Sequence, residues 1–382
     1  MNCPHCAEPL ADGAAFCEAC GQRVGAAPAT PAAPVDVSEE ASPFEMTAAT
    51  RAPGRPTASG PPACLQCGGT VGPDGYCEQC GSKRPSERDH FREQPVPTVA
   101  GVCDRGVRKA ANEDAMALHA TTQAGGRVVL VVLDGVSNTD HSSEASMAGA
   151  TAARDVLLTP LPSGLGTDTS RNSAVKQVFG AAVQAAQDAI VGFTPEGSDK
   201  PPSATFAVAV VEGQRLHIAN IGDSRAYWLP DAGPGVQLSV DDSVAQAQIA
   251  AGMDRKVAEE GPQGHAITRW LGEDAPDLVP HLVESVLTEP GWVLVCSDGL
   301  WNYASVPSAV AEQVAAAGTT DPLELAVALV GFANASGGHD NITVALARVE
   351  GTAPAPSPPP ASGQNAAGET TVETAPPGET DG

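Results

Sequence analysis

Hydrophobic positions are concentrated between about residues 98 and 350, where they form short strand-like runs and two helical stripes. The longest run, residues 128–133, is entirely apolar and ends at Asp134-Gly135, which predicts a buried strand. Apolar residues recur at helical spacing in two segments, 175–190 and 323–330, which predicts two amphipathic helices. The same reasoning predicts further strands at residues 206–211, 216–221, 226–229, 292–297 and 342–349.

These predicted strands outnumber the helices, and several follow one another at hairpin distance. An alternating doubly wound sheet would instead place a helix between successive parallel strands. The pattern therefore favours an α+β fold with packed, largely antiparallel sheets flanked by helices.

Two long segments have a composition that does not support a packed core. Residues 21–63 and 351–382 are rich in Pro, Ala, Ser and Thr and contain few large apolar side chains, so we expect a disordered linker and a disordered tail. Residues 85–97 are expected to be a short linker before a catalytic domain at 98–350. The tail also contains a threonine-rich acidic stretch, Glu369 to Thr374, which is a candidate for phosphorylation, although plain disorder is the preferred interpretation.

Cysteine spacing indicates metal binding at the N-terminus. Eight of the ten cysteines form four Cys-x-x-Cys pairs: Cys3 and Cys6, Cys17 and Cys20, Cys64 and Cys67, and Cys77 and Cys80. Two such pairs complete the tetrahedral four-sulfur site of a structural Zn²⁺, so we expect two small zinc ribbons at residues 1–20 and 64–84. The alternative, a redox pair, lacks the βαβ context of thioredoxin-like motifs. Cys103 and Cys296 are expected to be small buried residues.

Net charge and hydropathy narrow the classes of partner. A formal charge of −25 disfavours binding to nucleic acid or to an anionic membrane. The longest apolar run is six residues, well short of the ~20 needed for a membrane helix, and Met1 is not followed by a secretory signal pattern. We therefore expect a cytoplasmic protein, and a monomer.

Acidic residues recur next to Gly or Asn at the predicted ends of strands. They lie in the stretches Asn112-Glu113-Asp114, Asp134-Gly135, Gly222-Asp223-Ser224-Arg225, Ser297-Asp298-Gly299 and Asp340-Asn341. Any single one of these stretches more often forms a turn than supplies a metal ligand. If they converge on one edge of a sheet, the carboxylates would repel one another unless hard cations such as Mg²⁺ or Mn²⁺ were bound. Two such ions would activate water for attack on phosphorus, which indicates a phosphoryl hydrolase.

The order and the residues of these motifs resemble those of the bacterial branch of the metal-dependent type 2C protein phosphatases. The resemblance covers residues 98–350 and includes Cys103-Asp104-Arg105-Gly106, Ile267-Thr268-Arg269 and Gly338-His339-Asp340-Asn341. It implies an antiparallel β-sandwich flanked by helices and a serine/threonine phosphatase dependent on two Mn²⁺ or Mg²⁺ ions, with a third ion in some members. The cysteine pairs resemble bacterial double zinc ribbons.

The resemblance also implies a role for each acid. Asp134 would bridge the two ions, Gly135 through its carbonyl and Glu113 would complete the second ion, and Asp298 and Asp340 would hold the first. Asp223, together with Asp298, would hold a third ion. Asp114 would bind water in the outer shell, and Asn341 would support the turn that carries Asp340.

The chain departs from the family pattern in three places. The usual phosphate-binding Arg is replaced by Lys109 with Arg108 beside it, which leaves open which of the two contacts phosphate. The loop after Gly135 lacks the usual Gly-Gly-His stretch, and Asp242 stands where a histidine is usual. His141 and His339 are nearest to the metal motifs, but for both a surface role is preferred over that of a general acid.

The expected partners are phosphorylated proteins, with an opposing Ser/Thr kinase as a candidate. An alternative is a pseudophosphatase that binds phosphoproteins without turnover; the retained acids argue against it, and only Lys109 favours it. The ribbons are hypothesised to dock a protein partner and raise its local concentration.

Overall fold

The computed structural model describes residues 68–351 apart from 74, 82–83, 85, 124, 137–138 and 162–166. The chain separates into two compact units, residues 1–86 and 87–382, and each is considered by itself. The predicted linker 21–63 lies outside the described residues, as does the tail beyond Gly351.

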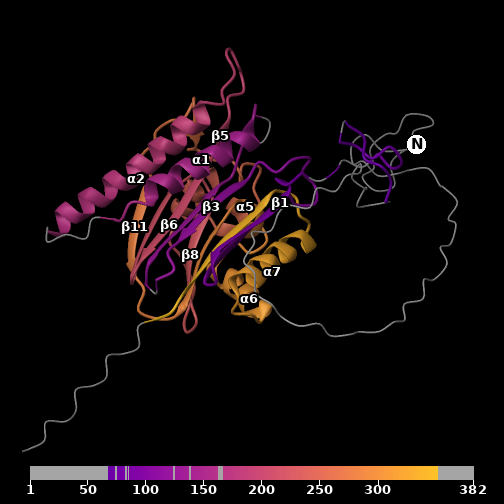
Figure 1. Cartoon of the computed structure of the whole chain (residues 1–382). Helices are drawn as coiled ribbons and strands as arrows, with labels where there is room; N and C mark the ends of the chain where they lie inside the picture. The colour runs from indigo at the N-terminus through magenta and orange to yellow at the C-terminus, as the bar shows by residue number, and fades with distance from the viewer. Residues whose placement is uncertain are drawn as a thin grey trace, which may run out of the picture. The chain divides into compact units, whose positions relative to one another are not determined.

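The larger unit has four layers, with two antiparallel sheets between two layers of helices (Figure 1). One sheet has the strand order β11 (His281–Val286), β7 (Arg215–Ile221), β6 (Phe206–Glu212), β4 (Arg127–Leu133) and β3 (Ala115–Ala120). The other has the order β1 (His90–Val96), β2 (Val99–Asp104), β13 (Ile342–Val349), β12 (Gly291–Cys296), β8 (Arg225–Pro230) and β9 (Val236–Gln237). A short pair joins β10 (Leu271–Gly272) to β5 (Ser203–Ala204). The predicted antiparallel sandwich flanked by helices is therefore confirmed.

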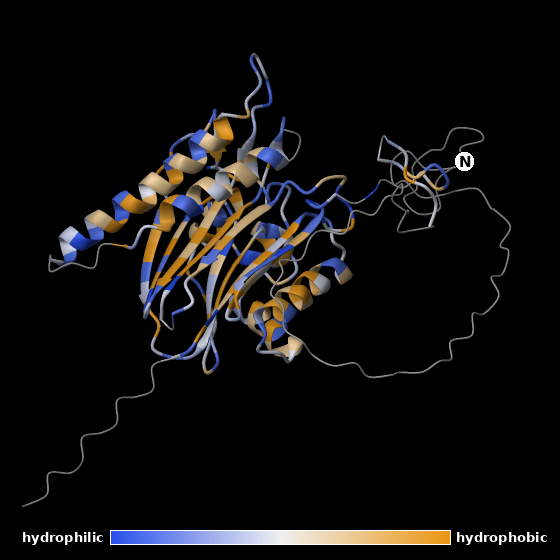
Figure 2. Cartoon of the chain, viewed as in Figure 1, coloured by the Kyte–Doolittle hydropathy of each residue, from blue (hydrophilic) through white to orange (hydrophobic). Residues whose placement is uncertain are grey.

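Each sheet buries both of its faces. Along β4, Val129, Val131 and Leu133 face the helices α1 (Ser142–Leu157) and α2 (Asp168–Val191), whereas Leu130 and Val132 face the opposite sheet. This explains why the strand is apolar at every position from Val128 to Leu133 rather than at alternate ones. Strands of both sheets are correspondingly hydrophobic in Figure 2.

The second sheet is covered on its outer face by α5 (Asp298–Trp301), α6 (Pro307–Ala317) and α7 (Pro322–Ala335). Helix α7 is capped by Asp321, whose carboxylate accepts hydrogen bonds from the backbone N–H groups of Leu323 and Glu324. Pro322 follows at the first helical position. Two short helices, α3 (Val244–Ala250) and α4 (Arg255–Glu259), lie between β9 and β10. In the described part of the chain no single helix could span a membrane; only α6 and α7 taken together are long and apolar enough, and they are bent by 118°.

The prediction of a linker at 85–97 was wrong. Residues His90–Val96 form β1, an edge strand paired with β2, and Glu93 accepts a hydrogen bond from the backbone N–H of Leu118 at 2.8 Å. The larger unit therefore begins at Glu87 rather than at residue 98. A fragment designed to separate the ribbons from this unit has to retain β1.

In the smaller unit, the described residues include one of the predicted cysteine turns. Val71 and Cys77 form a β-bridge, and the N–H of Gly81 donates to the carbonyl of Cys77 at 2.8 Å, which closes a tight turn containing Cys77 and Cys80. Cys77 is buried against Val71. The other predicted zinc ligands, Cys3, Cys6, Cys17, Cys20, Cys64 and Cys67, lie outside the described residues.

Candidate active site

Antiparallel pairing brings the acidic motifs to one end of the sandwich. The start of β3 lies beside the end of β4, so Glu113 and Asp114 are neighbours of Asp134. In the other sheet, the end of β12 lies between the starts of β13 and β8, which places Asp298 among the loops that carry Asp340 and Asp223. The acids thus come from five separate chain segments, as the sequence predicted.

Asp134 and Gly135 are held where β4 ends. The backbone N–H of Asp134 donates to Thr205 Oγ1 at 3.0 Å, and the Asp134 carbonyl accepts from the N–H of Thr205 at 2.8 Å. A Cβ atom on Gly135 would lie 2.5 Å from the Glu113 carbonyl oxygen and 2.5 Å from Ser142 Oγ. Glycine is therefore required for Glu113 to approach this backbone so closely.

Asn341 fixes the loops around Asp340. Its side-chain amide donates to the carbonyls of Arg105 and Ala111 at 2.8 and 2.9 Å, and its Oδ1 accepts from the Glu113 backbone N–H at 2.8 Å. The side chain is 2 % exposed, so all three bonds are shielded from water. Asn341 acts as a support for the turn, as predicted, and also joins Asp340 to the Glu113 segment.

Lys109 and Arg108 have different surroundings in this loop. Lys109 Nζ lies 2.7 Å from Asp340 Oδ1, whereas the Arg108 side chain is exposed. Burial opposes the charge on Lys109, but the hydrogen bond to Asp340 and the charges of Asp340, Asp134 and Glu113 outweigh it and raise the pKa of Lys109. Of these two predicted phosphate-binding residues, only Lys109 is directed into the acidic cluster.

Asp114 is fully buried and is oriented by two hydroxyl groups. Ser297 and Thr343 donate to its Oδ2 at 2.7 and 2.8 Å, while Oδ1 has no hydrogen-bond partner within the described structure. Burial raises the pKa of Asp114 to about 7, and the charges of Asp340 and Asp298 add to the rise against these two hydrogen bonds. An oriented carboxyl oxygen without a partner can accept a proton from water in the site.

Asp298 and Asp223 are linked through a buried arginine network. Arg225 is 1 % exposed, donates to both oxygens of Asp241 and lies 3.7 Å from the centre of the Trp301 ring. Trp301 closes α5, the helix that Asp298 begins, and its indole N–H donates to the Asp223 carbonyl at 2.9 Å. The network therefore fixes the Asp223 loop relative to the Asp298 helix.

The electrostatics of the cluster fit a cation site. Burial raises the pKa of Asp134 well above its usual value, and the charges of Asp114, Asp298, Asp340 and Asp223 raise it further. Burial and the charge of Asp298 likewise raise the pKa of Asp223. Asp298 Oδ1 is buried without a hydrogen-bond partner among the residues described. Uncompensated carboxylate oxygens of this kind are the donor set that Mg²⁺ and Mn²⁺ prefer.

No group of three or more His, Cys, Asp or Glu side chains in the described ranges is arranged to hold an ion by itself. Mg²⁺ does not require such a group, because it usually binds one or two carboxylates and keeps several waters.

In the described structure, neither of the two histidines considered from the sequence has a side-chain hydrogen bond or ion pair to the clustered acids. His141 is exposed at the start of α1, and His339 is exposed, with its backbone N–H donating to the Tyr303 hydroxyl at 3.1 Å. Sequence reasoning missed Ser297, Thr343 and Thr205, which orient the acids. The sequence signal that could have identified them is a Ser or Thr next to an acidic residue or next to the start of a strand.

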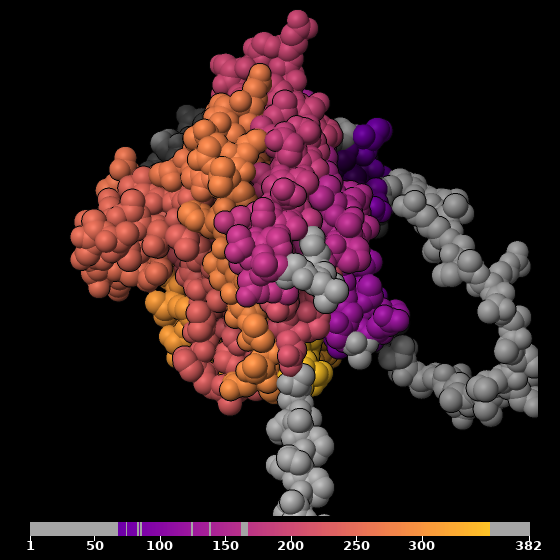
Figure 3. Space-filling model, turned by 90° about the vertical axis from the view of Figure 1, so that its left-hand side faces the viewer, coloured from indigo at the N-terminus to yellow at the C-terminus, as the bar shows by residue number. Residues whose placement is uncertain are grey.

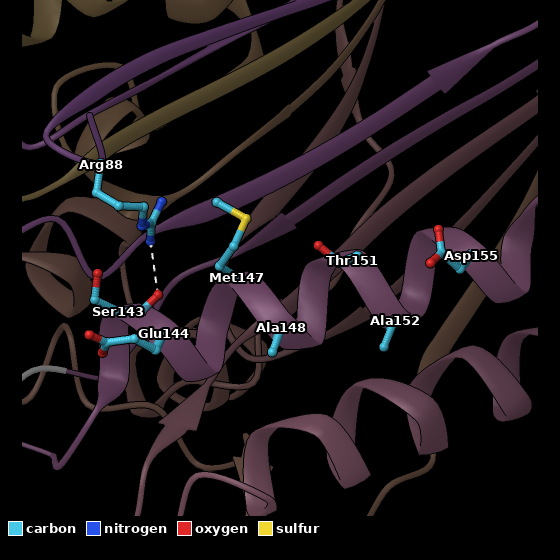
Figure 4. Close-up of a pocket in the computed structure, with 8 residues that line it drawn as sticks. All are labelled: Arg88, Ser143, Glu144, Met147, Ala148, Thr151, Ala152 and Asp155. Atoms are coloured by element: carbon cyan, nitrogen blue, oxygen red, sulfur yellow. Dashed lines mark hydrogen bonds between the residues drawn. The ribbon is translucent and has the colours of Figure 1, made fainter. Parts of the chain in front are cut away.

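Another hollow is lined by none of the clustered acids. It has a volume of about 640 Å³ and lies along the outer side of α1, with Arg88 at one end (Figure 4). Arg88 donates to the carbonyls of Asp114 and Ser143 at 2.5 and 3.1 Å. Arg88 thus ties the start of α1 to the Asp114 segment, which is a second reason why residues 85–97 are not a free linker.

Comparison with known proteins agrees with this geometry. The family model for protein phosphatase 2C matches residues 105–328, and the model for the double zinc ribbon matches residues 3–81. Cys77 and Cys80 fall within the latter match. The first of these matches covers more than half of the chain.

The relatives are bacterial enzymes. The serine/threonine protein phosphatase PstP of Mycobacterium tuberculosis is 31% identical over 256 residues, which is 66% of this chain but only 45% of PstP. Protein phosphatase PhpP of Streptococcus pneumoniae is 27% identical over 253 residues, 65% of this chain and 96% of PhpP. The solved serine/threonine phosphatases of S. agalactiae and M. tuberculosis superpose with TM-scores of 0.56 and 0.53 at 25% and 28% identity, covering 68% and 66% of this chain and 100% and 98% of theirs. The chain, with its antiparallel sandwich and its acidic cluster, belongs to the protein phosphatase 2C family.

Proposed function

We propose that this protein is a metal-dependent serine/threonine protein phosphatase that hydrolyses phosphomonoesters on proteins. The observation that carries the proposal is the meeting of acids from five chain segments at one end of the sandwich, where burial and mutual repulsion raise the pKa of Asp134. Its relatives PstP and PhpP are named as protein phosphatases. An opposing Ser/Thr kinase is the proposed partner.

Glu113, Asp134, the Gly135 carbonyl, Asp298 and Asp340 would hold two Mn²⁺ or Mg²⁺ ions, with Asp223 and Asp298 available for a third. When bound, such ions supply Lewis acidity and lower the pKa of water. The protein side chains then have separate tasks. Lys109 would contact a phosphoryl oxygen, and Asp114 Oδ1 would accept a proton from the attacking water. The hydroxyls of Ser297 and Thr343 keep Asp114 in that orientation.

The proposal is tested by hydrolysis of a phosphothreonine peptide by the full chain, freed of Mn²⁺ and Mg²⁺ by dialysis. We expect turnover to appear only when Mn²⁺ or Mg²⁺ is added back. A folded chain that binds the phosphopeptide with added Mn²⁺ and releases no phosphate would overturn the proposal and support the pseudophosphatase instead.

Replacement of Lys109 distinguishes it from Arg108. Lys109→Ala is expected to lower kcat/KM for the phosphopeptide about 10- to 100-fold, because a hydrogen bond to a charged group contributes about 1.5–3 kcal/mol. Arg108→Ala is expected to change it less than about threefold, and Lys109→Arg to keep most of the activity. Steady-state kinetics at saturating Mn²⁺ provide the measurement. A larger loss in Arg108→Ala than in Lys109→Ala would assign the phosphate contact to Arg108.

A further inference from the structure

A second hollow opens beside the acidic cluster and is lined by a histidine that the roles above do not use. It has a volume of about 420 Å³ and lies between α4 and the start of α6, with His265, Trp301, Asn302 and Ser305 on its wall. Asn302 Nδ2 donates to Asp298 Oδ2 at 3.1 Å, so the hollow adjoins one of the proposed metal ligands. The α3–α4 segment stands out as a lobe, orange-red at the left of Figure 3.

His265 is held at this position by an aromatic contact. Its ring stacks on the indole of Trp301 with 6.3 Å between centroids and 27° between planes. Trp301 is itself fixed by Arg225 and by the Asp223 carbonyl. The His265 side chain is nevertheless exposed, so it can contact a bound substrate and exchange protons with solvent.

The charge of His265 acts on the cluster. Burial and the charge of Asp340 raise the pKa of Asp298 to about 6, while the Asn302 hydrogen bond and the charges of His265 and Lys109 oppose the rise. The remaining charged groups of the hollow are largely paired along α4: Arg255 with Glu259 at 2.8 Å and Lys256 with Glu260 at 3.8 Å, while Asp254 caps the helix. Among these acids, Asp298 is the one whose pKa is lowered by the charge of His265.

The other described histidines are less suitable. His90 contacts Asp104 at 2.5 Å and His281 contacts Asp242 at 2.8 Å. His217 is buried against Phe179 beneath α2, and His119 lies in β3, five residues beyond Asp114. His265 alone among them lines the hollow that adjoins Asp298.

We propose that His265 is the general acid that protonates the leaving hydroxyl of the phosphorylated serine or threonine. In this step the oxygen of water forms a bond to phosphorus, and the bond from phosphorus to the side-chain oxygen breaks. The electron pair stays on that oxygen, which takes the proton from His265, while the water's proton passes to the Asp114 carboxyl. His265 then recovers a proton from solvent. The proposal rests on the proposed phosphatase function and assigns a residue that takes part in it.

Two substrates with different leaving groups test the assignment. A serine or threonine alkoxide is strongly basic and needs a proton, whereas p-nitrophenolate leaves readily without one. At saturating Mn²⁺, His265→Gln and His265→Phe are expected to lower kcat for a phosphothreonine peptide about 100-fold and kcat for p-nitrophenyl phosphate less than about threefold. The Phe variant retains a ring that can stack on Trp301 but cannot donate a proton.

The pH profile provides a second readout. In the wild type, kcat for the peptide is expected to fall as pH rises, because a general acid must carry its proton, and this limb should be absent from both variants. His119→Gln, the same change on a strand away from the hollow, should leave both substrates unaffected. Equal losses on the two substrates, or no loss on the peptide, would overturn the assignment while leaving the phosphatase function intact. If the wild type hydrolysed neither substrate, both proposals would fail.

Discussion

Asp134→Asn is expected to lower kcat for a phosphothreonine peptide at least 10³-fold at saturating Mn²⁺. Asp134 is the acid whose pKa is raised by all four of Asp114, Asp298, Asp340 and Asp223, so it lies at the centre of the cluster. Removing its charge weakens both proposed cation positions at once. A bound cation contributes several kcal/mol of transition-state stabilisation, and about 4 kcal/mol corresponds to about 10³ in rate.

The same variant should be folded and, without divalent ions, at least as stable as the wild type. Replacing a carboxylate by a neutral amide removes repulsion from the buried cluster. We therefore expect an unchanged or higher Tm in Mn²⁺-free buffer and a smaller rise in Tm on adding Mn²⁺. Asp155→Asn is the matched control, because Asp155 is exposed and its ion pair is with its neighbour Arg154 on α1. Activity of Asp134→Asn within tenfold of the wild type would remove Asp134 from the centre of the mechanism.

Stability of the chain without Mn²⁺ or Mg²⁺ is expected to fall as pH rises from about 5 to 8. The pKa of Asp114 is about 7 in the folded protein against 3.8 as its ordinary value, and that of Asp298 is about 6. Over this interval the folded state holds more protons than the unfolded state, so the free energy of unfolding decreases with pH. Between pH 5 and 7 the change for Asp114 alone corresponds to about 3 kcal/mol, or roughly 8 °C in Tm for a domain of this size.

Thermal unfolding followed across this pH range, with and without Mn²⁺, provides the measurement. Saturating Mn²⁺ should reduce or reverse the slope, because cations bind the ionised carboxylates of the folded state. Asp114→Asn should flatten the slope without Mn²⁺, whereas Asp155→Asn should not. Burial lowers the pKa of His217, which opposes this slope within the interval, whereas exposed acids with lowered pKa values, such as Asp231 and Asp277, act only at lower pH. A Tm that rises from pH 5 to 8 in the ion-free chain would show that the acids are not mutually destabilising.

Both predictions concern the same feature: the fold brings together charges that it does not neutralise with protein groups alone. Lys109 is directed at the cluster and pairs with Asp340, and the hydroxyls of Ser297 and Thr343 share a single oxygen of Asp114. The remaining negative charge is available for cations. Stability is thereby reduced at the place where phosphoryl chemistry would occur.

Much of the fold could be predicted from local pattern. The strand at residues 128–133 was identified because both of its faces are buried, which makes every position apolar. The helix at 175–190 was identified because Val175, Phe179, Ala182, Ala186 and Ile190 are all buried on one side of α2. The acids were recognised because they follow or precede such strands. In antiparallel sheets, neighbouring strand ends meet at the same edge.

Among the elements that were not predicted, β1 and α1 were missed for definite physical reasons. β1 is an edge strand with the sequence HFREQPV and few buried positions, so its composition is that of a linker. Helix α1 buries Ala145, Ser146, Gly149, Ala150 and Ala153, small residues that give no recognisable apolar stripe. Gly149 allows this helix to pack closely, since a Cβ atom there would lie 2.9 Å from Leu133 and 3.0 Å from Ile190. Close packing of small side chains depends on partners distant in the sequence.

The sequence by itself determined the kind of site: which acids take part, in what order, and that hard cations suit them. Only the tertiary structure decided which neighbouring side chain serves the site. Lys109 and Arg108 are adjacent in sequence, yet the loop held by Asn341 directs Lys109 to Asp340 and leaves Arg108 in solvent. His265 lies 33 residues from Asp298 in sequence, and its stacking on Trp301 places it beside α5, the helix that Asp298 begins. Side-chain direction and long-range packing are set by the assembled fold, and no local pattern of residues encodes them.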